Sequence, residues 1–266
     1  MSGEGRATGG ASVTARDLCL TRRIDEGPLH ALADVDLSVA RGEILSLVGP
    51  SGCGKTAFLR LVAGLEPPSS GSLDVEGATP EAARRACLRG LVPDDAELQP
   101  HHGVGDNVLH GLDVLGEDAE ARRRRVDESL ALTGLDGFES VRLDSLSPGL
   151  RRRVAIARAL APAPRLLLLD DAFLGLDEFV REGLVVRLRS LRRQAGLTVI
   201  LTTSSIAEAV HAGDRVAAMA GRPGRILDVI DVPLPNARPP EMRESDAFAA
   251  VARQVRATLA PTIPET

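Results

Sequence analysis

The sequence predicts an α/β fold with a mostly parallel core sheet, an N-terminal antiparallel β subdomain and an inserted helical subdomain. Three apolar runs, Ile44–Val48, Leu166–Asp170 and Thr198–Thr202, are typical of strands buried on both faces of a parallel sheet. A glycine-rich loop and a helical pattern follow the first run directly. About a hundred residues of mostly helical pattern then separate the first run from the second, which indicates a helical insertion in the sheet.

The remaining elements follow from local patterns in chain order. Residues 1–12 are small and polar, and we expect a disordered tail. Short apolar segments from Val13 to Val39 predict strands, interrupted by a turn around Glu26–Pro28. Helices are predicted at 57–63, 117–130 and 148–160, and after a proline-rich stretch at 245–259. We therefore expect a main domain at 13–232 with a helical subdomain at about 95–162, followed by a segment at 233–266.

The composition excludes several classes of protein. Hydrophobic residues make up 44% of the chain and aromatic residues only 2%, so Leu, Val, Ile and Ala must form the core. The net charge of −5 argues against broad electrostatic binding to nucleic acid, and the arginine runs at 122–125 and 151–153 are interpreted as solvated helix faces. The three scattered cysteines predict neither a disulfide framework nor a metal cluster, and they fit a reducing cytoplasm. No stretch approaches the roughly 20 apolar residues of a membrane span, so we expect a soluble protein that reaches a membrane only through a partner.

The most specific motif is a glycine-rich loop that carries the chain's only lysine. Residues Gly49–Thr56 fit the pattern G-x-x-x-x-G-K-[ST], in which backbone N–H groups and a helix N-terminus bind phosphate oxygens. All other members of the Lys+Arg total of 32 are arginine, so the compact ammonium is kept only where a phosphate must be reached. The motif predicts a P-loop NTPase that binds a nucleoside triphosphate. The expected phosphate-binding residues are Gly49, Ser51, Gly52, Cys53 (through its backbone), Gly54, Lys55, Thr56 and Ala57.

A magnesium site is predicted beside this loop. Lys55 would reach the β- and γ-phosphates, and the Thr56 hydroxyl would bind Mg²⁺. Asp170 ends the second apolar run, at the carboxyl end of a buried strand, where an acid is placed to hold the same ion. We therefore expect ATP and Mg²⁺ as cofactors, with Thr56 and Asp170 as the metal ligands. The adjacent His101 and His102 could bind a different metal, but a solvated loop is the expected reading.

From about Val13 to Ile230 the chain resembles the nucleotide-binding subunits of ABC transporters. The resemblance rests on ordered blocks, which are Gly49–Thr56, Leu146–Leu150, Arg153–Leu160, Leu166–Asp171 and Leu176–Asp177. The segment Gly221–Ile226, just after a strand, resembles the branch of nitrate, sulfonate and taurine importers. The resemblance implies a dimer in which each ATP site combines one chain's P-loop with the other chain's signature, here represented by Ser147 and Gly149.

The chain departs from the family pattern at positions used for hydrolysis. The resemblance implies catalytic roles for Asp171, Ser204 and Asp94, where the family usually has glutamate, histidine and glutamine. Asp171 is one methylene shorter than glutamate, and a displacement of about 1 Å can cost about a hundredfold in rate. Ser204 carries no charge, and Asp94 adds negative charge beside the phosphates. We therefore expect nucleotide binding with weakened turnover.

Two further departures concern the signature and the base. In the signature, Pro148 removes a backbone donor and Leu150 removes a side-chain amide, although proline suits the first turn of a helix. No aromatic residue precedes Phe58, so the ring that usually stacks on adenine in the family is missing. Such stacking is worth roughly 1–3 kcal/mol, and its loss lowers affinity without abolishing binding.

The resemblance implies the ATP-binding subunit of an ABC importer for a nitrate-, sulfonate- or taurine-like solute, with weakened hydrolysis. The alternative is a non-hydrolysing regulatory half that pairs with a complete ABC ATPase. A small-molecule P-loop kinase shares only the loop, and roles in DNA repair or translation do not suit the single-domain length. The expected partners are transmembrane permease subunits (contacted by Asp94–Asn107), a second ATP-binding subunit in a homo- or heterodimer, and an extracytoplasmic solute-binding protein, but no nucleic acid. The expected location is cytoplasmic, peripheral on the inner face of the cell membrane.

Overall fold

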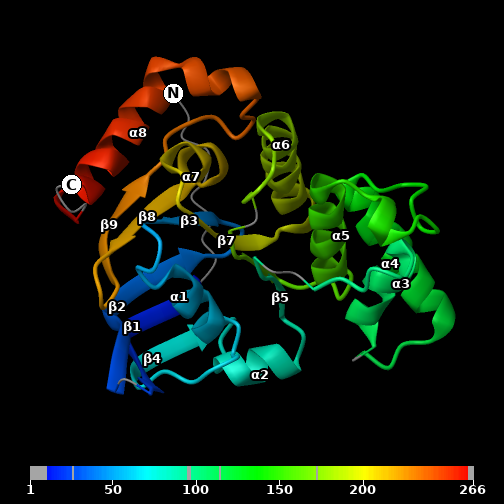
Figure 1. Cartoon of the computed structure of the whole chain (residues 1–266), viewed down its shortest axis with the longest axis horizontal. Coiled ribbons are helices and arrows are strands. Elements are labelled where there is room, and N and C mark those ends of the chain that lie inside the picture. The colour runs from blue at the N-terminus through cyan, green and yellow to red at the C-terminus, as the bar shows by residue number, and fades with distance from the viewer. Residues whose placement is uncertain (1–10, 26, 95–96, 114, 172, 263–266) are drawn as a thin grey trace.

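The larger sheet forms the centre of the protein. The structure is a computed structural model that describes residues 11–25, 27–94, 97–113, 115–171 and 173–262 (Figure 1). Within these residues the larger sheet has six strands, in the order β5-β6-β7-β3-β8-β9. Their bounds are Arg89–Val92 (β5), Leu166–Leu169 (β6), Thr198–Thr203 (β7), Ile44–Val48 (β3), Arg215–Ala220 (β8) and Arg225–Asp231 (β9). All neighbours pair in parallel except β8 and β9, so the predicted mostly parallel core sheet is confirmed.

The apolar runs are buried because helices cover both faces of the sheet. Every residue of β3, β6 and β7 is buried. Alternate residues of β6 join different cores: Leu166 and Leu168 belong with the side chains of α1 (Lys55–Val62), whereas Leu167 and Leu169 belong with those of α6 (Glu178–Ala195). A strand covered on both sides has no reason to alternate polar and apolar residues.

The smaller sheet is antiparallel, as expected, and has the order β2-β1-β4. The bounds are Ala11–Ile24 (β1), Gly27–Ala40 (β2) and Ser70–Val75 (β4). Most of the predicted tail lies outside the described residues. However, β1 already includes Ala11 and Ser12, because the Ser12 carbonyl accepts a 2.7 Å hydrogen bond from the N–H of Glu76 and its hydroxyl bonds the Glu76 carboxylate.

The chain between β5 and β6 is helical and lies to one side of the sheet (Figure 1). Its helices surround an apolar cluster of their own, which includes Val108, Leu130 and Val154. The predicted helix at 148–160 has those bounds in the structure, and the one predicted at 117–130 begins at Ala119, because Asp118 caps it. The helices are α3 (Val104–Leu109), α4 (Ala119–Thr133) and α5 (Pro148–Leu160), with 3₁₀ turns at His110–Leu112 and Leu143–Ser145.

The remaining helices pack on the sheets and at the C-terminal end. Apolar side chains of α8, including Phe248 and Val255, pack against β8 and against residues of α7. Ser245 caps α8, so this helix begins one residue after the predicted start. The elements are α2 (Pro80–Arg85), α7 (Ile206–Ala212), α8 (Asp246–Leu259) and 3₁₀ turns at Pro240–Glu244 and Ala260–Thr262. Among the described residues, no helix combines the length and apolar character needed to cross a membrane.

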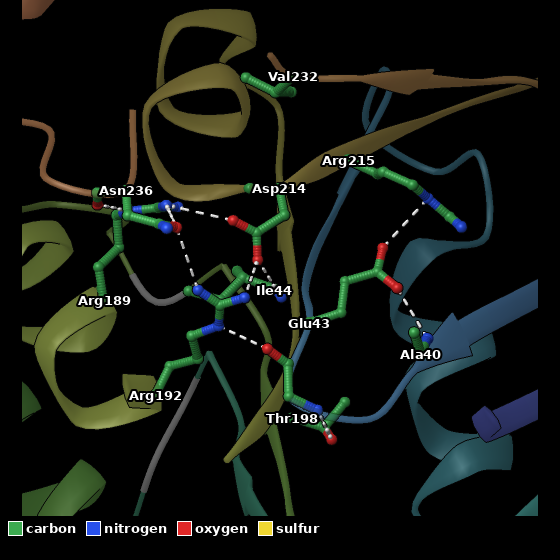
Figure 2. Close-up of polar contacts among 12 residues, drawn as sticks. Ala40, Glu43, Ile44, Arg189, Arg192, Thr198, Asp214, Arg215, Val232 and Asn236 are labelled. Atoms are coloured by element: carbon green, nitrogen blue, oxygen red, sulfur yellow. Dashed lines mark hydrogen bonds and ion pairs between the residues drawn. The ribbon is translucent and has the colours of Figure 1, made fainter. Parts of the chain in front are cut away.

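An ion-pair cluster joins the core sheet to α6 and the C-terminal segment (Figure 2). The Asp214 carboxylate lies 3.1 Å from guanidinium nitrogens of both Arg189 and Arg192, and it accepts a 2.9 Å hydrogen bond from the N–H of Ile44. Arg189 is only 4% exposed and also donates a 2.9 Å hydrogen bond to the carbonyl of Asn236. Asp214 therefore holds a buried guanidinium between β3 and the segment that leads to α8.

We expect Asp214→Ala to lower the free energy of unfolding by about 3 kcal/mol, because it leaves the buried Arg189 charge without its acid partner. Urea unfolding of both proteins would measure this loss. Asp127→Ala is a suitable control, since Asp127 is exposed on α4 and makes no hydrogen bond or ion pair with another described side chain. A loss no larger for Asp214→Ala than for the control would contradict this role.

Candidate functional site

The candidate site lies where the parallel strands of the core sheet end. Strands β5, β6, β7, β3 and β8 run in the same direction, so the segments after them meet at one edge of the sheet. Ligands of open α/β sheets bind at this carboxyl edge. The segments carry, in sheet order, Asp94, then Asp170 and Asp171, then Ser204, then the Gly49–Gly54 loop, and finally Arg222.

The loop between β3 and α1 is shaped by close backbone contacts. A Cβ on Gly49 would lie 1.9 Å from the carbonyl oxygen of Met219, so no larger residue fits there. Gly54 has φ +97° and ends the loop as the N-cap of α1, a conformation that glycine adopts without strain. Ser51 and Gly52 are exposed, whereas Cys53 is 2% exposed and its side chain belongs to the core. The loop therefore offers its backbone, and not the Cys53 sulfur, to a ligand.

The single lysine is folded over this loop. Its Nζ donates hydrogen bonds of 2.8 Å to the Gly49 carbonyl and 3.1 Å to the Pro50 carbonyl. The Lys55 side chain is only 6% exposed, and Ala57, two residues on, is buried in the first turn of α1. The ammonium is thus fixed at the loop, where backbone N–H groups and the helix N-terminus attract phosphate oxygens.

The two predicted metal ligands lie together. The Thr56 hydroxyl donates a 3.1 Å hydrogen bond to Asp170 Oδ1, although the two residues are 114 positions apart in the chain. The Thr202 hydroxyl donates to the same oxygen at 2.7 Å and accepts a 3.0 Å hydrogen bond from the N–H of Asp171. One carboxylate and one hydroxyl beside a phosphate loop fit Mg²⁺, which takes few protein ligands and completes its shell with phosphates and water.

The Asp171 carboxyl lies near several other charged side chains. Burial raises the pKa of its carboxyl above the usual range; Lys55 opposes this rise, and the Asp170 and Asp94 carboxylates add to it. Its φ of +39° is tolerated better by aspartate than by most residues. Asp171 therefore lies among the charges of Lys55, Asp170 and Asp94 at the carboxyl edge of the sheet.

Sequence reasoning missed Arg152, which links α5 to the segment after β5. Its guanidinium donates 2.8 Å and 3.0 Å hydrogen bonds to the carbonyls of Pro93 and Asp94. Burial lowers the pKa of Arg152, while Asp94, Asp171 and Asp170 oppose that shift, so its charge faces all three acids. The solvated-face interpretation of 151–153 is wrong for this residue, because the bend of the chain after β5 brings carbonyls onto the helix.

Ser204 and the signature residues occupy different places. Ser204 is exposed just after β7. Ser147 is the N-cap of α5, where its Oγ accepts a 3.4 Å hydrogen bond from the N–H of Leu150. Gly149 is buried, and a Cβ there would lie 2.5 Å from Cγ1 of Val180. Within the described residues no hydrogen bond or ion pair joins Ser147 or Gly149 to the loop of the same chain.

The two adjacent histidines lie in a loop before α3. His101 and His102 are exposed, and the His102 ring stacks on His110 with 5.8 Å between centroids. In the described part of the chain, no group of three or more His, Cys, Asp or Glu residues could hold a metal ion.

A strand, a phosphate loop, a helix and an acid on the next-but-one strand are shared by many nucleotide-binding proteins, and comparison with known proteins decides among them. The sequence model of the ABC transporter family matches residues 32–174. The chain belongs to the ABC transporter family. This ABC protein is 41% identical over 217 residues to the taurine import ATP-binding protein TauB of Burkholderia pseudomallei (strain 1710b), a match that covers 82% of this chain and 83% of that protein.

Other relatives agree with an importer-type ATPase subunit. TauB of Escherichia coli (strain K12) is 40% identical, over 77% of this chain and 79% of that protein. The Fe(3+) ions import ATP-binding protein FbpC of Pasteurella multocida is 39% identical, over 73% of this chain and 56% of that protein. This ABC ATPase therefore shares its P-loop NTPase fold and its family with ATP-binding subunits of importers.

Solved structures confirm the fold. The dimeric cassette MJ0796, bound to ADP and Pi after hydrolysis, superposes with a TM-score of 0.72 at 28% identity, covering 83% of this chain and 98% of that one. The cassette cbiO1 from Clostridium perfringens, part of the cbiONQ complex, superposes with a TM-score of 0.75 at 25% identity, covering 95% and 97%.

Proposed function

We propose that this ABC ATPase is the ATP-binding subunit of an importer for a small sulfonate-like solute, and that its hydrolysis is slow. The observation that supports this most strongly is the combination of an intact phosphate and metal centre with altered hydrolytic positions. Lys55 donates a hydrogen bond to the Gly49 carbonyl of the loop, and the Thr56 hydroxyl donates one to Asp170. Asp171 has less reach than the family's glutamate, Ser204 lacks the charge that a histidine can carry, and Asp94 adds a negative charge where the family has a neutral glutamine.

The chain's own residues divide the work of phosphoryl transfer, which consists mostly of positioning and electrostatic stabilisation. The loop N–H groups and Lys55 hold the phosphates, and Thr56 and Asp170 would hold Mg²⁺, which neutralises charge that develops on the phosphates. Thr202 keeps Asp170 oriented through its 2.7 Å hydrogen bond. Asp171 accepts the proton of the attacking water, and Ser204 donates a hydrogen bond toward the γ-phosphate.

Weak hydrolysis follows from reach and from charge. A carboxylate one methylene shorter than glutamate stands further from the attacking water, and losing a general base typically costs about 10²- to 10⁴-fold. Asp94 adds a negative charge where the family usually has a neutral glutamine, and this charge repels the phosphates of the nucleotide. Arg152 offsets part of this repulsion, because its charge faces the Asp94 carboxylate. The balance favours binding over turnover.

The proposed assembly pairs two ATP-binding subunits under transmembrane permease subunits, on the inner face of the cell membrane. Ser147, exposed at the start of α5, would meet the γ-phosphate bound to the partner chain. Gly149 would act there through its backbone, and Val180 leaves no space for a side chain at this position. Residues 94–107 would face the permease, and an extracytoplasmic solute-binding protein would deliver the solute.

A regulatory half is the second candidate, and the same altered positions favour it. If this chain binds ATP without turning it over, a complete ABC ATPase would have to supply the hydrolysis. Pairing does not repair both composite sites, however. One site would still use Asp171, and the other would still face the signature in which Leu150 replaces an amide side chain.

Transport by the assembled complex tests the proposal. The complex of this chain with its permease and solute-binding protein is placed in proteoliposomes. ATP is supplied on the side of the membrane where the ATP-binding subunits lie, and uptake of taurine, nitrate and Fe³⁺ is measured. We expect ATP-dependent uptake of the sulfonate that is lost in Lys55→Ala. Uptake of Fe³⁺ without any uptake of taurine would contradict the solute class, and uptake unaffected by Lys55→Ala would favour the regulatory half.

A further inference from the structure

The turn between β8 and β9 packs directly on the phosphate loop. Both backbone groups of Gly224 in this turn bond to β2. The N–H donates a 3.0 Å hydrogen bond to the Ala31 carbonyl, and the carbonyl accepts a 3.0 Å hydrogen bond from the Ala33 N–H. A Cβ on Gly224 would lie 2.0 Å from the carbonyl oxygen of Cys53. The turn is therefore fixed between β2 and the loop, with no space for a side chain at their contact.

This turn places Arg222 over the exposed part of the loop. A Cβ on Gly52 would lie 2.5 Å from Arg222 Nη2, 3.2 Å from its Cζ and 3.4 Å from its Nε, so the guanidinium group lies against Gly52. Gly52 has φ +77° and is exposed, as is Arg222. The position follows from topology, because β8 is the parallel neighbour of β3 and both end at the same edge of the sheet.

The Arg222 charge has no acid partner in the described part of the chain. Neither a hydrogen bond nor an ion pair joins it to a described residue, whereas Arg225 in the same hairpin lies 2.9 Å from the Asp34 carboxylate. The Arg222 charge nevertheless acts on the loop. Burial raises the pKa of the Cys53 thiol, and Lys55 and, more weakly, Arg222 oppose that rise. Two cations from different elements thus act on one phosphate-binding loop.

We propose that Arg222 binds the polyphosphate of the nucleotide, as a second cation beside Lys55. This inference rests on the proposed function of the loop as an ATP site. A guanidinium presents several donors in a plane and matches phosphate oxygens in pairs, which a lysine cannot do. Because no aromatic residue precedes Phe58, phosphate contacts carry a larger share of the affinity than in proteins with a stacked adenine.

The consequence is a measurable loss of affinity for any ligand that carries the same phosphates. Hydrogen bonds to charged groups contribute enough that losing one weakens binding by about tenfold to a hundredfold. The effect belongs to the phosphates, so it does not depend on the base. Inorganic tripolyphosphate, which has no base, is therefore the probe that separates a phosphate contact from a contact with adenine.

Calorimetric titration of the full chain with Mg·ATP and with Mg·tripolyphosphate tests the proposal. We expect Arg222→Gln to weaken both ligands by about tenfold to a hundredfold, and Arg222→Lys to restore part of the loss. Arg225→Gln is the matched control in the same hairpin and should bind like the wild type. Thermal unfolding of each variant without ligand shows whether the protein still folds. We expect no change for Arg222→Gln, because Arg222 makes no hydrogen bond to a described residue that its removal would break.

Two outcomes would overturn the proposal: unchanged affinity of Arg222→Gln for both ligands, or weaker binding of ATP alone, which would indicate a contact with the base. Lys55→Ala separates these from failure of the proposed function. If the wild type binds ATP no better than Lys55→Ala does, the loop is not the nucleotide site, and both proposals fall. If the wild type binds and Lys55→Ala does not, the result for Arg222→Gln decides its role alone.

Discussion

Lys55→Ala is expected to weaken Mg·ATP binding by about a hundredfold or more. Lys55 is 6% exposed and its ammonium is held over the loop by two carbonyl hydrogen bonds, so its charge is poorly screened by water. Charge-assisted hydrogen bonds to phosphate are about twice as strong as neutral ones, and the variant loses them. Titration calorimetry measures the effect. Lys55→Arg should not restore binding, because a planar guanidinium does not fit a space shaped for an ammonium.

Arg60→Ala provides the control for Lys55→Ala. Arg60 lies on the same helix, and its side chain is 49% exposed and pairs with Glu66 at 3.2 Å. Its removal should leave ATP affinity unchanged. Equal affinities of Lys55→Ala and Arg60→Ala for Mg·ATP would show that the ammonium does not contact the nucleotide.

Asp171→Glu is expected to raise ATP turnover by about tenfold. The longer side chain brings the carboxylate about 1 Å nearer the attacking water, and a change of that size can alter the rate by about a hundredfold. The gain is smaller than this because φ at Asp171 is +39°, a conformation that costs glutamate more than aspartate. Steady-state phosphate release measures the rate, and Asp171→Asn, which removes the base without changing size, should lower it.

A different result would reassign the base. If Asp171→Asn turns over ATP as fast as the wild type, Asp171 does not accept the proton of the water. If Asp171→Glu is slower than the wild type while ATP affinity is unchanged, the site is adapted to the shorter side chain, and weak hydrolysis has another cause.

The parts of the site that sequence could predict are those made by adjacent residues. The β3 strand, the loop and α1 follow one another, and Asp170 directly follows a strand of four leucines, so local patterns locate each of them. Thr202 and Arg152 were missed because tertiary contacts position them: Thr202 bonds an acid 32 positions away, and Arg152 bonds carbonyls 58 and 59 positions away. The β5 strand was missed because its four residues, Arg89–Val92, are too few and too mixed to show a pattern.

Arg222 and Gly149 show which features of the site local sequence patterns indicate and which they do not. Arg222 follows a strand that ends at the ligand-binding edge, and that position was a signal that the sequence contained. Gly149 illustrates the opposite case. The signature motif predicts that Gly149 meets a partner's phosphate, which stays a prediction, but no local pattern indicates its close packing against Val180, 31 positions further along the chain.

Steady-state phosphate release from Mg·ATP, with the wild-type chain beside Lys55→Ala, tests most directly whether this ABC ATPase hydrolyses ATP at its own loop. A slow release in the wild type that disappears in Lys55→Ala is the predicted result. Wild-type chain that binds Mg·ATP but releases no phosphate above the level of Lys55→Ala would contradict it, and would make this chain a regulatory half whose hydrolysis belongs to a partner.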